Sequence, residues 1–118
     1  MLCNFLQKGV AKNTPQAQQD IREILSYISD ELMNPQAAKH HEDTFRDAIV
    51  GLSEEPKRYR RIREQPWGHE GVRKINALNY YIYFWIDDVS RTVYITAVIY
   101  AARDQQRQLE ERNVLGHD

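Results

Sequence analysis

The stretch of sequence that decides the fold is GVRKINALNYYIYFWIDDVSRTVYITAVIYAARD, residues 71–104. It contains runs of β-branched and aromatic residues separated by turn-forming residues, a pattern typical of β-strands joined by short turns. The pattern predicts strands at about 72–76, 80–86 and 92–100. The last two runs are apolar on both faces, so we expect central strands that are covered on both sides. In the middle run, the alternation assigns Tyr80, Ile82, Phe84 and Ile86 to one face and Tyr81, Tyr83 and Trp85 to the other.

Two helices are predicted before the strands, at about 15–33 and 36–52. Thr14 can cap the first helix and is followed by a proline, which suits the first helical position. Asn34 precedes a second proline and should end this helix, because the residue before a proline avoids the helical region. Asp20 is assigned to the polar side. The apolar stripes at helical spacing are Ile21, Ile24, Leu25, Ile28 and Leu32, then Ala38, His41, Phe45, Ala48, Ile49 and Leu52.

The two helices are joined by a short turn, so we expect an antiparallel helical hairpin. Together these elements predict an α+β fold in which an N-terminal helical hairpin packs on a small antiparallel β-sheet. A weak pattern around residues 7–12 suggests a further strand, and the polar segment 101–112 suggests a short, exposed C-terminal helix or tail. The length of 118 residues predicts a single domain, residues 1–118.

Charge is distributed unevenly along the chain. The net charge of −1 argues against a general nucleic-acid coat. Residues 20–55 carry 3 basic and 9 acidic side chains, whereas residues 56–74 carry 7 basic and 2 acidic ones. The helical part should therefore be negative, while the connector between the helices and the strands, residues 53–71, should present a positive surface.

The basic run Lys57–Arg63 within this connector is the leading candidate for a binding surface. Arginine guanidinium groups bind phosphate or carboxylate through two parallel hydrogen bonds; the alternative is a solvated loop whose charges maintain solubility. For Arg103 the alternative is a structural ion pair with Asp104. Arg73 and Lys74 are adjacent in a strand and should point to opposite faces. The residues predicted to contact a partner or target are Arg58, Arg60, Arg61, Arg73 and Arg103.

Other chemistry is sparse. His40 and His41 are adjacent on a helix and cannot easily share one metal ion. His69 has no evident catalytic partner. Cys3 is the single cysteine, which excludes an internal disulfide and is typical of a reducing cytoplasm. The sequence contains no phosphate-binding loop, nucleophile elbow or zinc signature, so we predict neither a cofactor nor a metal. The strand tyrosines are expected to pack in the core, although aromatic side chains on a sheet can also stack on bases.

The order of these elements resembles the ParE/RelE toxins of bacterial type II toxin–antitoxin pairs. The resemblance is carried by PQAQQDIREILSYI, NPQAA, LSEEPKRY, GVRKINALNYYIYFWID and VYITAVIYAARD, which together span residues 15–104. It implies a toxin that inhibits growth in the cytoplasm and a cognate antitoxin that wraps the toxin in a hetero-oligomer. Family members usually open with a strand, so either residues 5–12 supply one or this strand is irregular here.

The family contains two branches with different targets. RelE-like members are endoribonucleases that cut messenger RNA in the ribosome; here the matching residues would be Lys74, Arg73 and Arg103. That set is incomplete, because Tyr81 stands where those nucleases carry an arginine and no Tyr or His follows Arg103 until His117. ParE-like members poison DNA gyrase by protein contact and need no catalytic set. The resemblance therefore favours a ParE-like gyrase inhibitor, with an mRNA endoribonuclease and a non-toxic binding module as the alternatives.

Overall fold

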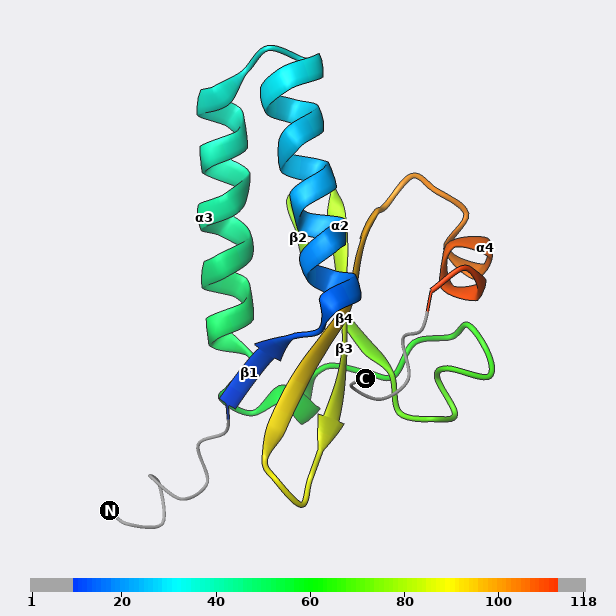
Figure 1. Ribbon diagram of the computed structural model, residues 1–118. Coiled ribbons are helices and arrows are strands. Elements are labelled where there is room, and N and C mark those ends of the chain that lie inside the picture. The colour runs from blue at the N-terminus through cyan, green and yellow to red at the C-terminus, as the bar shows by residue number, and fades with distance from the viewer. Residues whose placement is uncertain (1–9, 113–118) are drawn as a thin grey trace, which may run out of the picture.

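The computed structural model in Figure 1 describes residues 10–112. Two helices stand side by side in front of a four-stranded sheet, and a short third helix lies to one side. The elements in chain order are β1 (Val10–Asn13), α2 (Pro15–Ser26), the π-helical turn η1 (Tyr27–Glu31), α3 (Pro35–Gly51), the 3₁₀ turn η2 (Pro56–Arg58), β2 (Arg73–Ala77), β3 (Tyr80–Asp87), β4 (Thr92–Tyr100) and α4 (Gln105–Glu110).

The first helix begins where the sequence predicts. The Thr14 hydroxyl accepts a hydrogen bond from the Ala17 N–H at 3.2 Å and so satisfies a donor at the start of α2. The helix expected at 15–33 is regular only through α2 and then widens into η1. There the Leu32 N–H donates to the Tyr27 carbonyl, five residues back, at 3.0 Å.

The second helix, α3, covers the range expected from the sequence. Asn34 caps it, and the side-chain oxygen accepts from the Ala37 N–H at 3.0 Å. The chain turns between the two helices at Met33, which has a positive φ of 53°. Within residues 10–112, none of the helices combines the length and the apolarity that a membrane crossing requires.

The sheet has the strand order β1-β4-β3-β2, so the two strands predicted to be central are central. β2, β3 and β4 are antiparallel neighbours, but β1 runs parallel to β4, with Val10 opposite Thr92. The three strands predicted from the sequence are thus antiparallel as expected, and the parallel strand β1 makes the four-stranded sheet mixed. The helical hairpin and two strands separate β1 from β4 in sequence, so no tight turn dictates an antiparallel direction. The strand expected near 7–12 begins at Val10; residues 1–9 lie outside the described part.

Each face of the sheet has its own core, as the alternation in β3 predicts. The face toward α2 and α3, called here the helix face, buries Ala17, Phe45, Ile49, Leu52, Ala77, Ile82, Phe84, Val93, Ile95 and Val98. The opposite face, called here the second face, lies under the connector and α4 and buries Ile62, Trp67, Val72, Tyr83, Ala97, Ile99 and Leu109.

A β-bulge in β4 keeps these two cores in register. Tyr83 is opposite Ala97, whereas its neighbour Phe84 is opposite Ile95, so Thr96 is an extra residue in β4. Its buried hydroxyl donates to the Tyr83 carbonyl at 3.4 Å. Because of this extra residue, the side-chain alternation of β4 restarts at Ala97 and matches that of β3 on both sides of the bulge.

Asp20 on α2 joins three distant parts of the chain. It was expected on the polar side of the helix, but it is only 3% exposed. Its carboxylate accepts from the Val98 N–H of the central strand at 3.0 Å and from Arg112 Nε at 3.1 Å. The C-terminal segment is therefore not simply an exposed tail. Leu109 on α4 is fully buried, and Arg112 is tied to the first helix.

Replacing Asp20 by Ala should lower the free energy of unfolding by about 3–5 kcal/mol, because the Arg112 guanidinium loses its counterion and the Val98 N–H loses its acceptor. Urea denaturation followed by circular dichroism would measure this change. Gln18→Ala, at an exposed position of the same helix, is the matched control and should change stability by less than about 0.5 kcal/mol. A loss below about 1 kcal/mol for Asp20→Ala would contradict a central role for this carboxylate.

Candidate partner-binding surface

The basic connector is held against the edge of the sheet rather than looping freely away from it. Arg61 forms an antiparallel bridge with Arg73 of β2, and the Ile62 N–H donates to the Val72 carbonyl at 2.9 Å. The buried Ile62 side chain anchors this contact in the second-face core. A Cβ atom added at Gly68 would collide with the Ile62 carbonyl, so the return of the connector requires a glycine there.

Arg73 is the best-fixed arginine of the predicted set. Its Nη1 donates to the main-chain carbonyls of Tyr59 and Lys57, which ties the preceding connector to β2. Its Nε is buried and has no hydrogen-bond partner. Burial lowers the pKa of Arg73, the Arg61 charge lowers this pKa further, and the Asp88 carboxylate acts in the opposite direction.

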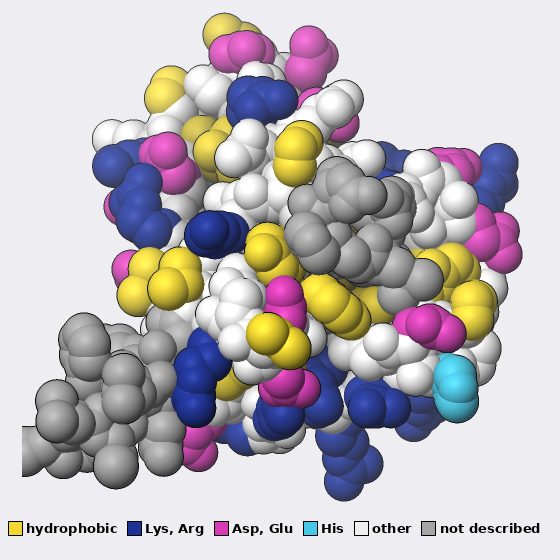
Figure 2. Space-filling view, turned by 60° about the horizontal axis from the view of Figure 1, so that its bottom comes forward, with side chains coloured by type: hydrophobic (Ala, Val, Ile, Leu, Met, Phe, Trp, Pro, Cys, Tyr) yellow, Lys and Arg dark blue, Asp and Glu magenta, His cyan; other side chains and the backbone are white. Residues whose placement is uncertain are grey.

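The other predicted contact residues are exposed. Arg58 donates to the Tyr59 hydroxyl at 2.8 Å, and its guanidinium lies 4.9 Å from the Tyr59 ring centroid. Arg60, Arg61 and Arg103 form no ion pair with any carboxylate in residues 10–112. Figure 2 shows Lys and Arg side chains close together along the lower margin of the face that it views, with acidic side chains nearby.

Arg103 is not part of the same surface as Arg73. It follows Tyr100, which pairs with Tyr80 at the far end of β3, whereas Arg73 pairs with Phe84. Four residues along a strand correspond to about 13 Å. Asp104 does not pair with Arg103; its carboxylate caps α4 by accepting from the Arg107 N–H at 3.2 Å.

Lys74 lies on the opposite face from Arg73, as their adjacent positions predict. Its Nζ is 3.8 Å from the ring centroid of Tyr81 and 5.9 Å from that of Tyr83. An ammonium group over an aromatic face is held there by the ring quadrupole. The residues that would match a nuclease therefore do not lie together. Lys74 and Arg73 are on opposite faces of the sheet, and Arg103 is at its distant end.

The second face is closed around Tyr83. This side chain is fully buried, and its hydroxyl donates to the Gln105 side-chain oxygen of α4 at 2.7 Å. Burial raises the pKa of the Tyr83 hydroxyl, and the nearby Glu64 carboxylate raises it further. Glu64 Oε1 is itself buried without a hydrogen-bond partner. The sequence analysis missed Glu64 and Gln105, because neither lies in a recognisable motif.

The tyrosines of the strands divide between core and surface. Tyr80 packs edge-on against Phe45 and His41, with ring centroids 5.5 and 5.9 Å apart, which confirms that it belongs with the helices. His41 also bonds through Nδ1 to the Ala37 carbonyl at 2.8 Å and so has a structural place in α3. Tyr100, opposite Tyr80, is 44% exposed and extends this aromatic cluster to the surface.

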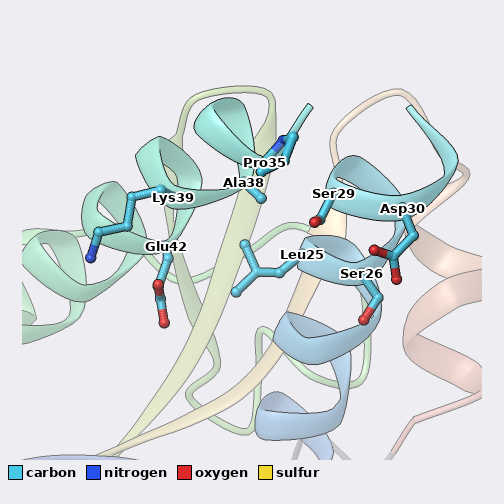
Figure 3. A pocket seen from close by; sticks show the side chains of 8 residues that line it. All are labelled: Leu25, Ser26, Ser29, Asp30, Pro35, Ala38, Lys39 and Glu42. Atoms are coloured by element: carbon cyan, nitrogen blue, oxygen red, sulfur yellow. The ribbon is translucent and has the colours of Figure 1, made fainter. Parts of the chain in front are cut away.

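A shallow groove of about 340 Å³ lies between the two main helices. In Figure 3, Leu25 of α2 points toward Ala38 of α3, and charged side chains stand at the rim. Lys39 at this rim pairs with Asp43 at 3.3 Å. The groove lining consists of Leu25, Ser26, Ser29, Asp30, Pro35, Ala38, Lys39 and Glu42.

Comparison with known proteins identifies the family. The family model described as "ParE toxin of type II toxin-antitoxin system, parDE" matches residues 12–105. The chain therefore belongs to the ParE toxin family of type II toxin–antitoxin systems, as the order of its sequence motifs predicts. No curated protein matches the sequence significantly.

Two solved structures share the fold. One is a chain of the chromosomal ParDE toxin–antitoxin system from P. aeruginosa, with 18% identity and a TM-score of 0.66, covering 80% of this chain and 97% of that chain. The other is a chain of the toxin–antitoxin complex RelBE2 from Mycobacterium tuberculosis, with 22% identity and a TM-score of 0.53, covering 81% and 94%. These likenesses concern the arrangement of helices and strands alone.

Replacing Arg73 by Gln should loosen the connector, because the shorter side chain cannot reach the carbonyls of Lys57 and Tyr59. We expect a loss of about 1–2 kcal/mol of stability and a several-fold faster tryptic cleavage after Lys57 and Arg58. Mass spectrometry of the fragments would give the rate at these two bonds. Arg46→Gln on the exposed side of α3 is the control and should leave that rate unchanged. Equal rates in wild type and Arg73→Gln would contradict the tethering role.

Proposed function

We propose that this ParE-family chain acts as a cytoplasmic toxin that inhibits bacterial growth by protein contact with DNA gyrase. In this proposal a cognate antitoxin neutralises it by forming a hetero-oligomer. Family membership supports the toxin assignment. The exposed arginines Arg58, Arg60, Arg61 and Arg103 are the proposed contact residues for partner and target, and Arg73 contributes by holding the connector in place.

The choice of gyrase over messenger RNA as the target rests on one observation. Lys74, Arg73 and Arg103 are separated and do not converge on one point. Cutting RNA at a phosphodiester needs a base for the 2′-hydroxyl, an acid for the leaving oxygen and positive charge at the phosphate, all within reach of one bond. Here Lys74 is stacked on Tyr81, and Arg73 donates to main-chain carbonyls on the other face. Contact with a protein target makes no such demand on convergence.

The closed second face also favours contact with a protein target over cleavage of RNA. Tyr83 is fully buried and bonded to α4, so its hydroxyl is not available as a general acid. The raised pKa of this hydroxyl also opposes ionisation, so it does not supply a base near neutral pH. A messenger RNA strand would have to displace α4, whose Leu109 is part of the second-face core.

Expression of the chain alone should slow bacterial growth, and co-expression of the small protein encoded next to it should restore growth. The reason is that a partner which covers the exposed arginines competes with the target for them. Growth curves at verified soluble expression would measure the effect, with an early stop codon as the blank. Normal growth at high soluble expression would contradict the toxin assignment and favour a non-toxic binding module.

The target is tested by running two assays side by side on wild type and Lys74→Met. We expect both proteins to impair gyrase supercoiling equally, because Lys74 lies on the closed face and the substitution keeps its apolar stem. Primer extension on ribosome-bound messages should show no codon-phased cuts. Codon-phased cuts with unimpaired supercoiling, abolished by Lys74→Met, would reverse the ranking in favour of an mRNA endoribonuclease.

A further inference from the structure

Two arginines stand directly opposite each other at the edge of the helix face. Arg61 pairs with Arg73, Arg73 pairs with Phe84, and so the three side chains form one row across neighbouring chain segments. Residues directly opposite in an antiparallel pair share a face and have their Cβ atoms about 5 Å apart. The row therefore brings two guanidinium-bearing side chains out on the same side of the sheet.

This arrangement is unfavourable in the free chain. Like charges directly opposite in a sheet repel each other, and burial first and the Arg61 charge second lower the pKa of Arg73. The buried Nε–H of Arg73 lacks an acceptor, although Nη1 of the same group has two carbonyl partners. A buried donor without an acceptor costs free energy, so the Arg73 group is not fully satisfied by the chain itself.

Asp88 is an acid that acts on Arg73, but it is already engaged elsewhere. Asp88 raises the pKa of Arg73, which places it within electrostatic reach, but its carboxylate pairs with Lys57 Nζ at 2.8 Å. Arg61 is exposed and forms no ion pair within residues 10–112. The donors open to an outside oxyanion are thus those of the exposed Arg61 group and the accessible part of the half-buried Arg73 group, while the Arg73 Nε is covered.

We propose that Arg61 and Arg73 form a receptor for a single carboxylate side chain on an acidic segment of a protein partner. Two planar guanidinium groups offer donors in the fork geometry that a carboxylate accepts in bidentate fashion. The proposal deepens the function given above, because it names the chemistry by which the antitoxin would engage the connector.

Neighbouring features favour a peptide over a nucleic acid. A pocket of about 370 Å³ lies beside Lys57 and Asp88, and Ile86, two residues along β3 from the partner of Arg73, is among its lining residues. The charged residues of this lining are two acids and two bases, namely Glu55, Asp88, Lys57 and Arg91. A pocket of mixed charge and apolar lining suits a peptide, which can present one carboxylate at the arginine pair, better than a backbone that carries a charge at every phosphate.

The test is a titration of the full-length chain, with 15N-labelled arginine, observed through the Nε–H resonances of Arg61 and Arg73. The probe is the capped peptide acetyl-Gly-Glu-Leu-Glu-Gly-amide at fixed ionic strength, compared with the same peptide carrying Gln in place of Glu. We expect a saturable shift of both resonances with the Glu peptide only. Arg61→Gln should weaken binding about tenfold, because the partner carboxylate then loses one charged fork.

Arg46→Gln is the matched control, because it removes the same charge from the exposed side of α3 and should leave affinity unchanged. Circular dichroism would verify that Arg61→Gln is folded. Equal weakening by both variants, or no weakening by Arg61→Gln, would overturn the receptor. Tighter binding of a tetrathymidylate than of the Glu peptide would replace it with a phosphate site. Normal growth on expression with peptide binding intact would reject the toxin function and leave the receptor standing.

Discussion

The buried carboxylate of Asp20 is the interaction on which the arrangement of the other elements depends. It accepts from the Val98 N–H, which belongs to the central strand β4 beyond the last residue paired with the short strand β1. An unpaired strand N–H under a helix must find an acceptor, and the first helix supplies it through a side chain. The same carboxylate holds Arg112, so helix, sheet and C-terminal segment are fixed by one charged group.

This constraint explains why the two faces of the sheet differ so much. Because Arg112 is held by α2, the short helix α4 is kept over the second face, where Leu109 and Gln105 close it around Tyr83. The basic part of the connector runs along the edge of β2, where Arg61 bridges to Arg73. The exposed arginines therefore lie at the edge and at one end of the sheet. The side chains of the second face are mainly packed in its core.

Local sequence patterns predicted the helices, the central strands and the family. The caps at Thr14 and Asn34 and the apolar stripes act within a few residues, so they can be recognised without the tertiary structure. The sequence analysis placed Asp20 off the apolar stripe. Its spacing from Ala17 and Ile24 nevertheless puts it on the buried side, so the signal was present but a charged residue argued against it.

Other features depend on contacts between distant residues and left no local signal. The apolar run in β4 is continuous, so the extra residue at Thr96 cannot be recognised by periodicity. The direction of β1 is set by tertiary packing rather than by a turn. The donors of Arg73 are directed to carbonyls 14 and 16 residues earlier, and only the folded connector brings these groups together.

The bulge at Thr96 also determines how the gene for this chain can tolerate changes in length. Because Thr96 is the extra residue, removing it would leave Ile95 and Ala97 on their present faces and give β4 a regular alternation. Deletion of Ala97 would have the same effect with Thr96 in its place, whereas loss of an interior residue away from the bulge would exchange the faces of the residues between the deletion and the bulge or the strand end. Among in-frame single-codon deletions within this strand, those at positions 96 and 97 therefore disturb the assignment of side chains to the two faces least.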